Sequence, residues 1–508
     1  MALHKSVWQA TANVPLCTPL QEDLHVQVCV VGAGIAGLST AYLLAKAGKS
    51  VAVIDDGPIA GGMTQMTSAH LTHMMDDRYF ELERLHGGIG ARLAAESHTA
   101  AIERIEAIVR EERIGCDFAR VDGYLFLAEG DQPETLDKEL AAAHRAGLHA
   151  VKSVPEGPFG FKTGPCLLVP DQAQFHPLKY LAGLTQALHR NGGRVFTGSH
   201  ADAIEGGTPA LVHVGPRIVT ADAVVVATNT PINDRVAIHT KQAPYMTYVI
   251  GARVTRGSVP AVLAWDTGDP YHYMRVTAAG ADDILIVGGE DHKSGQADDT
   301  HERHARLEAW TRARFPMAGE VAFRWGGQVM ETVDYLSFTG RNPMDKDNVF
   351  IHTGDSGMGL THGTIAGMLL CDLVLGRRNP WAELYDPARK TVGAAREYTS
   401  ENLNVARQYA DWLTGGDVKS VDEIPRDHGA VMRRGLHKIA VYRDAQGMLH
   451  ERSAACPHLG CVVQWNRAEK TWDCPCHGSR FDCRGKVISG PANRDLASTE
   501  RPQNKRAA

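Results

Sequence analysis

The 508-residue sequence lacks several features that mark particular classes of protein. No apolar run approaches the roughly 18 residues that a membrane-spanning helix needs. The first 25 residues contain neither the apolar segment of a secretory signal nor a twin-arginine start. Lysine and arginine total 53 against 59 acidic residues, so no basic excess indicates nucleic-acid binding. These absences predict a cytoplasmic protein with no membrane span and no nucleic-acid partner.

Cysteine is scarce along most of the chain and concentrated at its end. Of the ten cysteines, five fall within the last 53 residues. Isolated cysteines in an intracellular chain are usually inert core residues, whereas a terminal cluster indicates a metal site. The clustered cysteines are Cys456, Cys461, Cys474, Cys476 and Cys483.

Near the N-terminus the sequence has the pattern of a β-α-β unit. Residues 26–31 and 51–54 are apolar strands on either side of a helix that begins at a glycine-rich turn, Gly32-Ala-Gly-Ile-Ala-Gly37. This G-x-G-x-x-G pattern allows a tight turn and close approach of a pyrophosphate, and Asp55 follows at the distance of a ribose-binding acid. An ordinary glycine-rich turn is the alternative, but the complete unit favours a dinucleotide site. The pattern alone does not distinguish FAD from NAD.

Two kinds of segment alternate beyond this unit. A helix at 177–190 and apolar strands at 223–228 and 349–352 predict that the parallel sheet continues. Between them, alternating and aromatic-rich segments predict the antiparallel strands of a second domain. Those segments are residues 245–254, 261–265, 271–276 and 284–287. We therefore expect an α/β fold in which the two domains interleave along the chain.

A second glycine-rich turn decides between the dinucleotides. Residues 352–367, HTGDSGMGLTHGTIAG, lead from a strand into an apolar helix that ends near Gly376. Three other motifs accompany this turn, namely the first G-x-G-x-x-G turn, the segment GGMTQMTSAH at 61–70 and the segment VVVATNT at 224–230. With these motifs, residues 25–390 resemble the D-amino-acid oxidase/glycine oxidase superfamily, the DAO-type FAD oxidoreductases. The resemblance implies a Rossmann-like FAD-binding domain interleaved with an antiparallel-sheet substrate domain.

The same resemblance implies which residues hold FAD. Some relatives attach FAD covalently through a histidine, but the matching position here is Met66, so we expect non-covalent FAD, with His70 and His73 nearby as alternatives. In the family the second turn faces the flavin, and its helix dipole stabilises negative charge there. The implied FAD-binding residues are Gly32, Gly34, Ala36, Gly37 and Asp55 at the adenosine and pyrophosphate, Thr67 and Ser68 along the flavin, Ala201 (in the strand after 195–200) at the adenine, and Gly357, Met358, Gly359, Leu360 and Thr361 at the isoalloxazine.

The terminal cysteine cluster resembles a Rieske [2Fe–2S] site. Residues 456–461 (CPHLGC) and 474–479 (CPCHGS) give the spacing C-x-H, fifteen residues, C-x-x-H. In Rieske centres two thiolates hold one iron and two histidines hold the other. A Cys₂His₂ zinc site is the alternative. The extra cysteine pair, the serine and residues 490–492 (GPA), which resemble the loop that shields a Rieske cluster, argue against zinc.

The Rieske resemblance assigns separate roles to these residues. It implies a disulfide between Cys461 and Cys476 and a hydrogen bond from Ser479 to a cluster sulfur. Phe481 stands where high-potential relatives have tyrosine, so we expect a potential below the top of the range of about −150 to +300 mV. The implied iron ligands are Cys456, His458, Cys474 and His477.

These patterns predict three folded regions. They are a DAO-type oxidoreductase (25–415), with FAD-binding segments at 25–85, 165–240 and 345–390 and a substrate domain at 86–164 and 241–344, then a linker (416–429), a small all-β Rieske domain (430–497) and a disordered tail (498–508).

A two-electron flavin and a one-electron cluster on one chain predict an enzyme that splits an electron pair. We expect an FAD-dependent dehydrogenase that oxidises a C–N bond of an amine or amino acid, passes electrons to its own Rieske cluster and then to an unidentified acceptor. The alternative is a reductase that relays electrons from NAD(P)H or a carrier to a partner oxygenase. No second G-x-G-x-x-G strand–helix unit is evident, which weakens this alternative. A non-catalytic protein would require both cofactor signatures to be vestigial.

An aromatic patch is one candidate for the substrate site. It comprises Tyr271, His272 and Tyr273, with Tyr245 and Tyr248 on a neighbouring segment. Such rings can bind an amine through cation–π contacts. At strand spacing, however, plain packing is the more frequent explanation.

Two further residues complete the set of catalytic candidates, which are Tyr271, His272, Arg275 and His362. His362, at the start of the flavin-facing helix, is expected either to tune protonation at the flavin or substrate or to serve only as a capping residue. Arg275 is expected to pair with a substrate carboxylate or merely with a surface acid.

Overall fold

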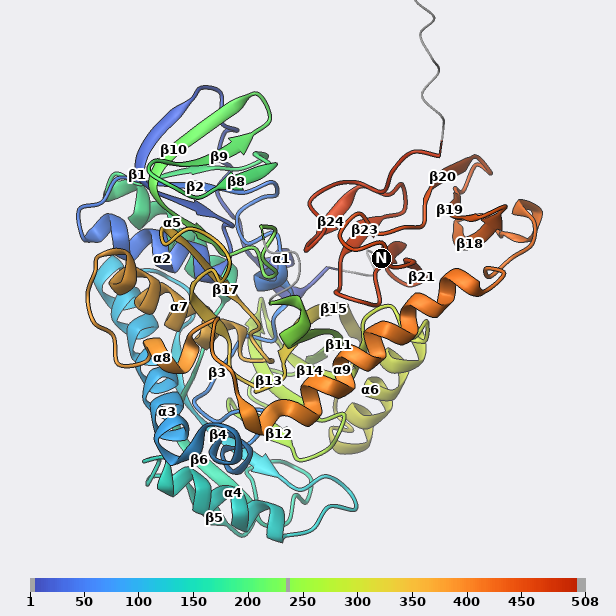
Figure 1. Cartoon of the computed structure of the whole chain (residues 1–508). Coiled ribbons are helices and arrows are strands. Elements are labelled where there is room, and N and C mark those ends of the chain that lie inside the picture. Colours follow the sequence, from blue (N-terminus) through green and yellow to red (C-terminus); the bar gives the residue numbers. More distant parts are fainter. Residues whose placement is uncertain (1–4, 234–237, 500–508) are drawn as a thin grey trace, which may run out of the picture.

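The computed structural model describes residues 5–233 and 238–499 (Figure 1). Within these residues no helix combines the length and the apolar character that crossing a membrane requires. Of the predicted tail, residues 500–508 lie outside the described residues, as do residues 234–237 of the predicted FAD-binding segment 165–240.

The first layer is a mostly parallel sheet. Its strands are β1 (Leu24–Val31), β2 (Val51–Ile54), β7 (Arg194–Phe196), β8 (Ala203–Glu205), β9 (Ala210–Val214), β10 (Arg217–Val226), β16 (Phe338–Arg341) and β17 (Val349–Thr353). The main order is β16-β17-β10-β1-β2-β7, in which all neighbours are parallel except the edge pair β16–β17. Off this path, β9 pairs with β10 and β8 with β9, both antiparallel. β2 is buried along its whole length, as expected for a strand covered on both faces. The predicted parallel sheet is therefore confirmed.

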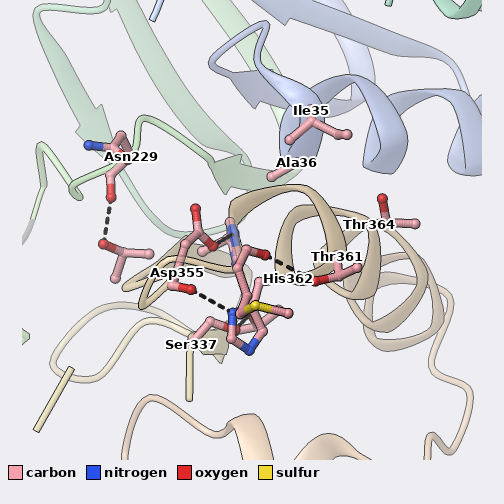
Figure 2. A network of polar contacts seen from close by, with 12 residues as sticks. Ile35, Ala36, Asn229, Ser337, Asp355, Thr361, His362 and Thr364 are labelled. Atoms are coloured by element: carbon pink, nitrogen blue, oxygen red, sulfur yellow. Dashed lines mark hydrogen bonds and ion pairs between the residues drawn. The ribbon is translucent and has the colours of Figure 1, made fainter. Parts of the chain in front are cut away.

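Helices cover this sheet and pack closely on one another. They include α2 (Ile35–Lys46), α5 (Pro177–Arg190) and α7 (Gly359–Val374). A Cβ added at Gly363 of α7 would lie 2.7 Å from the Ile35 side chain, so only glycine permits this approach to α2. Figure 2 shows Ile35 and Ala36 of α2 beside α7. The starts of α2 and α7, which follow the two glycine-rich turns, are thereby held side by side.

The second layer is a nine-stranded sheet. Its strands are β3 (His70–Leu71), β4 (Ala119–Phe126), β5 (Lys152–Val154), β6 (Cys166–Gln174), β11 (Gln242–Val254), β12 (Leu263–Asp266), β13 (His272–Ala279), β14 (Asp282–Lys293) and β15 (Val321–Thr332). All pairs are antiparallel except β12–β4. The four predicted strands of the second domain correspond to β11 to β14. The boundary expected at residue 165 is wrong, because β6 pairs with β4 and the chain leaves this sheet only at α5.

Further helices lie around the two sheets, and the sequence pattern did not indicate most of them. They are α1 (Val7–Thr11), α3 (Tyr79–Glu112), α4 (Glu134–Arg145), α6 (Thr300–Arg314), α8 (Ala382–Tyr385) and α9 (Ala395–Gln408), with 3₁₀ turns η1 (Met63–Met66), η2 (His239–Lys241), η3 (Val392–Ala394), η4 (Tyr409–Leu413) and η5 (Val421–Glu423). The long α3 bends at Gly87, whose φ is +70°. The polar helix expected at 397–412 corresponds to α9 followed by η4.

The C-terminal region forms two small antiparallel sheets. Their strands are β18 (His428–Arg434), β19 (His437–Arg443), β20 (Leu449–Ser453), β21 (Gln464–Asn466), β22 (Thr471–Asp473), β23 (Arg480–Asp482) and β24 (Val487–Ser489). α9 leads along the outside of the second sheet to this region (Figure 1). The segment 416–429 packs onto it, since Ile424 is buried among residues of β18 and β19. The all-β C-terminal domain is confirmed.

Candidate functional site

The first glycine-rich turn, between β1 and α2, brings backbone amides close to the end of β2. A Cβ at Gly32, where φ is +110°, would collide with the Ala227 carbonyl, and one at Gly37 would collide with the Gly32 carbonyl. Asp55 accepts hydrogen bonds from the amides of Ala33 (2.6 Å) and Gly57 (2.8 Å). Burial raises the pKa of Asp55 to about 6. The turn is thus tightly packed, and the backbone amides at the α2 N-terminus are left to face a ligand.

A cavity of about 1510 Å³ extends from this turn between the two sheets. Its volume exceeds the usual range of small-ligand pockets, about 300–1,000 Å³, and accommodates a dinucleotide together with a substrate. Of the predicted FAD-binding residues, those on its walls are Gly32, Gly34, Ala36, Asp55, Thr67, Ser68, Ala201, Gly357, Met358, Gly359 and Leu360. Gly37 and Thr361 do not line it: Gly37 packs on Gly32, and the buried Thr361 hydroxyl donates to the Met358 carbonyl at 3.1 Å.

The C-terminal domain closes one end of this cavity. Residues 486–490 and 492–495 line it, and Asn493 donates to the carbonyls of Ala201 (2.8 Å) and Asp202 (3.0 Å). Ala201 lies between β7 and β8 and not in a strand as expected. The two parts of the chain therefore share one cavity.

Two of the residues weighed for covalent attachment of FAD lie on the cavity wall. Met66 and His70 line it, whereas His73 does not. His70 contacts the Ser68 hydroxyl (3.0 Å) and the Met274 carbonyl (3.1 Å) with its two ring nitrogens. Burial lowers the pKa of His70 to about 3, so its ring is neutral near pH 7. With both nitrogens engaged, His70 offers no nucleophile, consistent with the prediction of non-covalent FAD.

The cysteine and histidine loops of the C-terminal domain converge. Cys456 and Cys474 are buried, and the His458 and His477 ring centroids lie 5.0 Å apart. The predicted disulfide between Cys461 and Cys476 is present and joins the two loops. Ser479 accepts a hydrogen bond from the Ala492 amide at 2.9 Å. Hydrogen bonds with the Cys474 and Ser479 side chains lower the pKa of Cys456. The two thiols thus lie next to each other, and so do the two imidazole rings.

These loops are docked against the second sheet and its flanking turn. The ring of the buried His239, in η2, lies 4.7 Å from the His458 ring and 6.0 Å from the His477 ring, centroid to centroid. Gln328 of β15 lines the cavity, and its Nε2 donates to the Gly478 carbonyl at 2.8 Å. Gln328 therefore touches both the cavity and the residue after His477. The sequence carried no signal for His239 or Gln328.

Three of the four predicted catalytic residues lie away from the cavity wall. His362 is buried in α7, where Nδ1 contacts the Asp355 carbonyl at 2.8 Å (Figure 2) and Nε2 contacts His98 at 3.2 Å. Burial lowers the pKa of His362 to about 4. This neutral ring braces the second glycine-rich turn and does not line the cavity. Tyr271 alone among the four lines the cavity.

His272 and Arg275 are held by other protein groups. His272 Nδ1 lies 3.0 Å from an Asp266 carboxylate oxygen, and the ring stacks on Trp310 at 4.7 Å. Arg275 is buried and donates to the carbonyls of Ala69 and Phe175. The expected role of Arg275 in pairing with a substrate carboxylate does not fit this position, because the side chain points into the protein core.

Acidic residues near the second turn were not foreseen from the sequence. Tyr271 donates to Asp76 at 3.0 Å, and a Cβ at Gly357 would collide with the same carboxylate. The acids that line this end of the cavity are Asp76, Asp77, Asp269, Asp291 and Glu331, together with Asp355 of the turn itself. They come from separate segments, so apart from the adjacent pair Asp76-Asp77 no sequence pattern announces them.

Comparison with known proteins agrees with this geometry. Residues 27–373 match the family described as FAD dependent oxidoreductase (DAO). The chain belongs to this family. Residues 415–500 match the Rieske [2Fe-2S] domain, so this DAO-family protein carries an iron–sulfur domain on the same chain.

Relatives share one or both parts. A Rieske 2Fe-2S iron-sulfur protein of Bacillus subtilis (strain 168), YhfW, is 30% identical over 498 residues, which is 97% of each chain. Gamma-glutamylputrescine oxidoreductase of Escherichia coli (strain K12) is 29% identical over 388 residues, covering 73% of this chain and 89% of the relative. The structure of glycine oxidase from Geobacillus kaustophilus superposes with a TM-score of 0.60 at 15% identity, covering 72% of this chain and 99% of that one. This last likeness concerns the fold.

The protein is an FAD-dependent oxidoreductase that binds FAD and a [2Fe–2S] cluster. Its residues fit both groups. The closed turn at Gly32 and the cavity suit the dinucleotide, and the two buried thiols with two converging imidazoles are the donor set of a Rieske centre. Cys461 and Cys476 are excluded as iron ligands because their sulfurs are joined in the disulfide.

Proposed function

We propose that this enzyme oxidises a C–N bond of an amine or amino acid and passes the electrons from FAD to its own Rieske cluster. The observation that carries the proposal is the position of Gln328. Its side chain lies on the cavity wall and donates a hydrogen bond to Gly478, the residue after the predicted iron ligand His477. A continuous path of a few contacts therefore joins the flavin cavity to the cluster loops.

The docking surface supports the same conclusion. His458 and His477, which would hold the outer iron of the cluster, face His239 of the FAD-containing part. A Cβ at Gly478 would lie 2.6 Å from the Pro244 side chain, so the loop approaches β11 as closely as glycine allows. In this position the cluster loops face the flavin-containing part directly, and no second protein is needed to carry the electrons between them.

The chemistry of C–N oxidation fits the cavity. When bound, FAD would supply the two-electron oxidant for the carbon next to nitrogen, and the imine product would be hydrolysed by water. The chain's own residues would position the substrate at the Gly357 turn, with the Tyr271 hydroxyl fixed by its hydrogen bond to Asp76. The relative named gamma-glutamylputrescine oxidoreductase supports an amine substrate, since it matches 73% of this chain.

An anaerobic reduction experiment tests the proposal. Amines and N-methyl amino acids are mixed with oxidised protein without oxygen, while flavin absorbance and the EPR signal of the reduced cluster are recorded together. We expect flavin bleaching followed by appearance of the cluster signal. A cluster that remains oxidised while the flavin is reduced would contradict the electron transfer. Rapid flavin reduction by NAD(P)H, without reduction by any amine or amino acid, would instead favour the reductase.

A further inference from the structure

The substrate end of the cavity is lined by acidic side chains with little compensating positive charge. Asp76 lies against the Gly357 turn, and Asp269, Asp291 and Glu331 line the same region together with Asp77. Among the described residues, the one lysine or arginine on this part of the wall is Arg78. Its guanidinium donates to the backbone carbonyls of Asp76 and Asp266 and so is already engaged by the protein.

Several of these carboxylates have one buried oxygen without a hydrogen-bond partner. One oxygen each of Asp77, Asp291 and Glu331 is inaccessible to solvent and bonds to no described atom. Burial, reinforced by the neighbouring acids, raises the pKa values of Asp77 and Glu331. Buried charges without partners destabilise a fold, so this arrangement is expected where a ligand supplies the missing positive charge.

Aromatic walls complete the acidic region. The rings of Tyr271 and Tyr273 lie 5.3 Å apart, centroid to centroid, and Tyr245 and Tyr335 line the same cavity. Tyrosine faces attract ammonium groups through cation–π interactions. The apolar parts of these rings also suit the methylene groups of an alkyl chain. Together with the carboxylates they suit an extended cation.

A metal ion and an amino acid fit the same walls less well. Among the described residues, no three carboxylate oxygens converge within 4.8 Å as a metal site requires; such a group is formed only by cysteines of the cluster loops. An amino-acid carboxylate would meet acids on this wall, since Arg275 is bound to backbone carbonyls elsewhere. The acids are thus too widely spaced for a metal ion, and this part of the wall offers no free positive charge to a substrate carboxylate.

We propose that the substrate is a diamine or polyamine without a carboxylate near the reacting carbon. This proposal rests on the C–N oxidation proposed above. One nitrogen lies at the Gly357 turn, and a second ammonium group is held by Asp291 and Glu331. At the reacting end the C–H bond breaks, its electron pair leaves with the hydrogen as hydride to bound FAD, and the nitrogen releases a proton to water. Water then hydrolyses the imine to an aldehyde and ammonia.

Equilibrium binding to holoenzyme whose flavin has been reduced beforehand with dithionite, under anaerobic conditions, tests this proposal without turnover, because reduced flavin cannot oxidise the amine. Putrescine (1,4-diaminobutane), butylamine and N-methylglycine are titrated while flavin absorbance and the melting temperature are followed. We expect putrescine to bind at least about tenfold more tightly than butylamine, because only putrescine offers a second charge to the buried carboxylates. The variants Asp291→Asn and Glu331→Gln should each lose this preference, whereas Glu103→Gln, which alters an exposed acid of α3, should retain it.

The melting temperature shows whether the variants fold. Removing one of several mutually repelling carboxylates is expected to raise it in the absence of ligand, so a lost preference cannot be ascribed to misfolding. Equal binding of putrescine and butylamine, tighter binding of N-methylglycine, or an equal response to Mg²⁺ or Ca²⁺ alone would overturn the polyamine proposal. Flavin reduction by N-methylglycine but not by putrescine would overturn it and leave the proposed C–N oxidation intact. If putrescine binds tightly but no amine or amino acid reduces the flavin, the proposed C–N oxidation fails, and with it putrescine's assignment as a substrate.

Discussion

The hydrogen bond between Gln328 and Gly478 is the contact whose removal bears most directly on electron transfer. In the variant Gln328→Met the side chain keeps a similar volume but loses the donor, so the Gly478 carbonyl is left without this partner. Leaving a buried acceptor unsatisfied costs about 1–3 kcal/mol. That free energy corresponds to a decrease of about 5- to 150-fold in the equilibrium constant for docking of the cluster loops.

Stopped-flow reduction under anaerobic conditions measures the effect. The informative quantity is the rate of cluster reduction divided by the rate of flavin reduction, because Gln328 also lines the flavin cavity. We expect this ratio to fall in Gln328→Met by up to the same factor as the docking equilibrium, about 5- to 150-fold. Gln446→Met, at an exposed position of the turn between β19 and β20, serves as the matched control and should leave the ratio unchanged. An unchanged ratio in Gln328→Met would refute the assignment of this contact to the electron path.

Three further changes test other parts of the structure. Burial alone would raise the pKa of Asp334, but a buried ion pair with Arg389, with an N–O distance of 2.7 Å, lowers it to about 2. Arg389→Met should therefore lower the free energy of unfolding by about 3–5 kcal/mol in denaturant titrations. Burial raises the pKa of Asp291 to about 7, so the folded state binds a proton that the unfolded chain releases, and stability should fall between about pH 4 and pH 7. Asp291→Asn should remove up to about 4 kcal/mol of that pH dependence, as compared by unfolding at pH 4 and pH 8; an unaltered slope would contradict the assigned burial effect. Asp55→Asn should weaken FAD binding by about 10- to 150-fold, since a hydrogen bond to a charged group contributes about 1.5–3 kcal/mol; fluorescence titration of apoprotein with FAD checks this, and unchanged affinity would contradict the role of Asp55.

The sequence predicted the elements whose patterns are local. The strand–turn–helix around Gly32 and the second turn before α7 appear where expected, because glycine spacing and apolar runs determine them within a few residues. The strands β11 to β14 were equally visible from their alternation. The path of the chain through the second sheet was harder to predict. β6 belongs to that sheet because it pairs with β4, a long-range contact that no local pattern encodes.

The residues of the site likewise fall into those that short motifs predict and those that only the fold brings together. The Rieske loops are short motifs with fixed spacing, and the disulfide between Cys461 and Cys476 followed from the resemblance. The acids around Gly357 come from separate segments, and their proximity depends on how β13, β14 and β15 are placed. Arg275 illustrates the converse, since its residue type suggested substrate binding but its position in β13 points it toward Ala69.

The most direct test of electron transfer within one chain is the dependence of cluster reduction on protein concentration. Oxidised protein is mixed anaerobically with excess reducing amine in a stopped-flow instrument over about a tenfold range of protein concentration, with rapid-freeze EPR for the cluster. If FAD reduces the cluster of its own chain, the first-order rate constant for cluster reduction is the same at every protein concentration. A rate constant that rises in proportion to protein concentration would show that the electrons pass between molecules and would contradict the docked arrangement as the route.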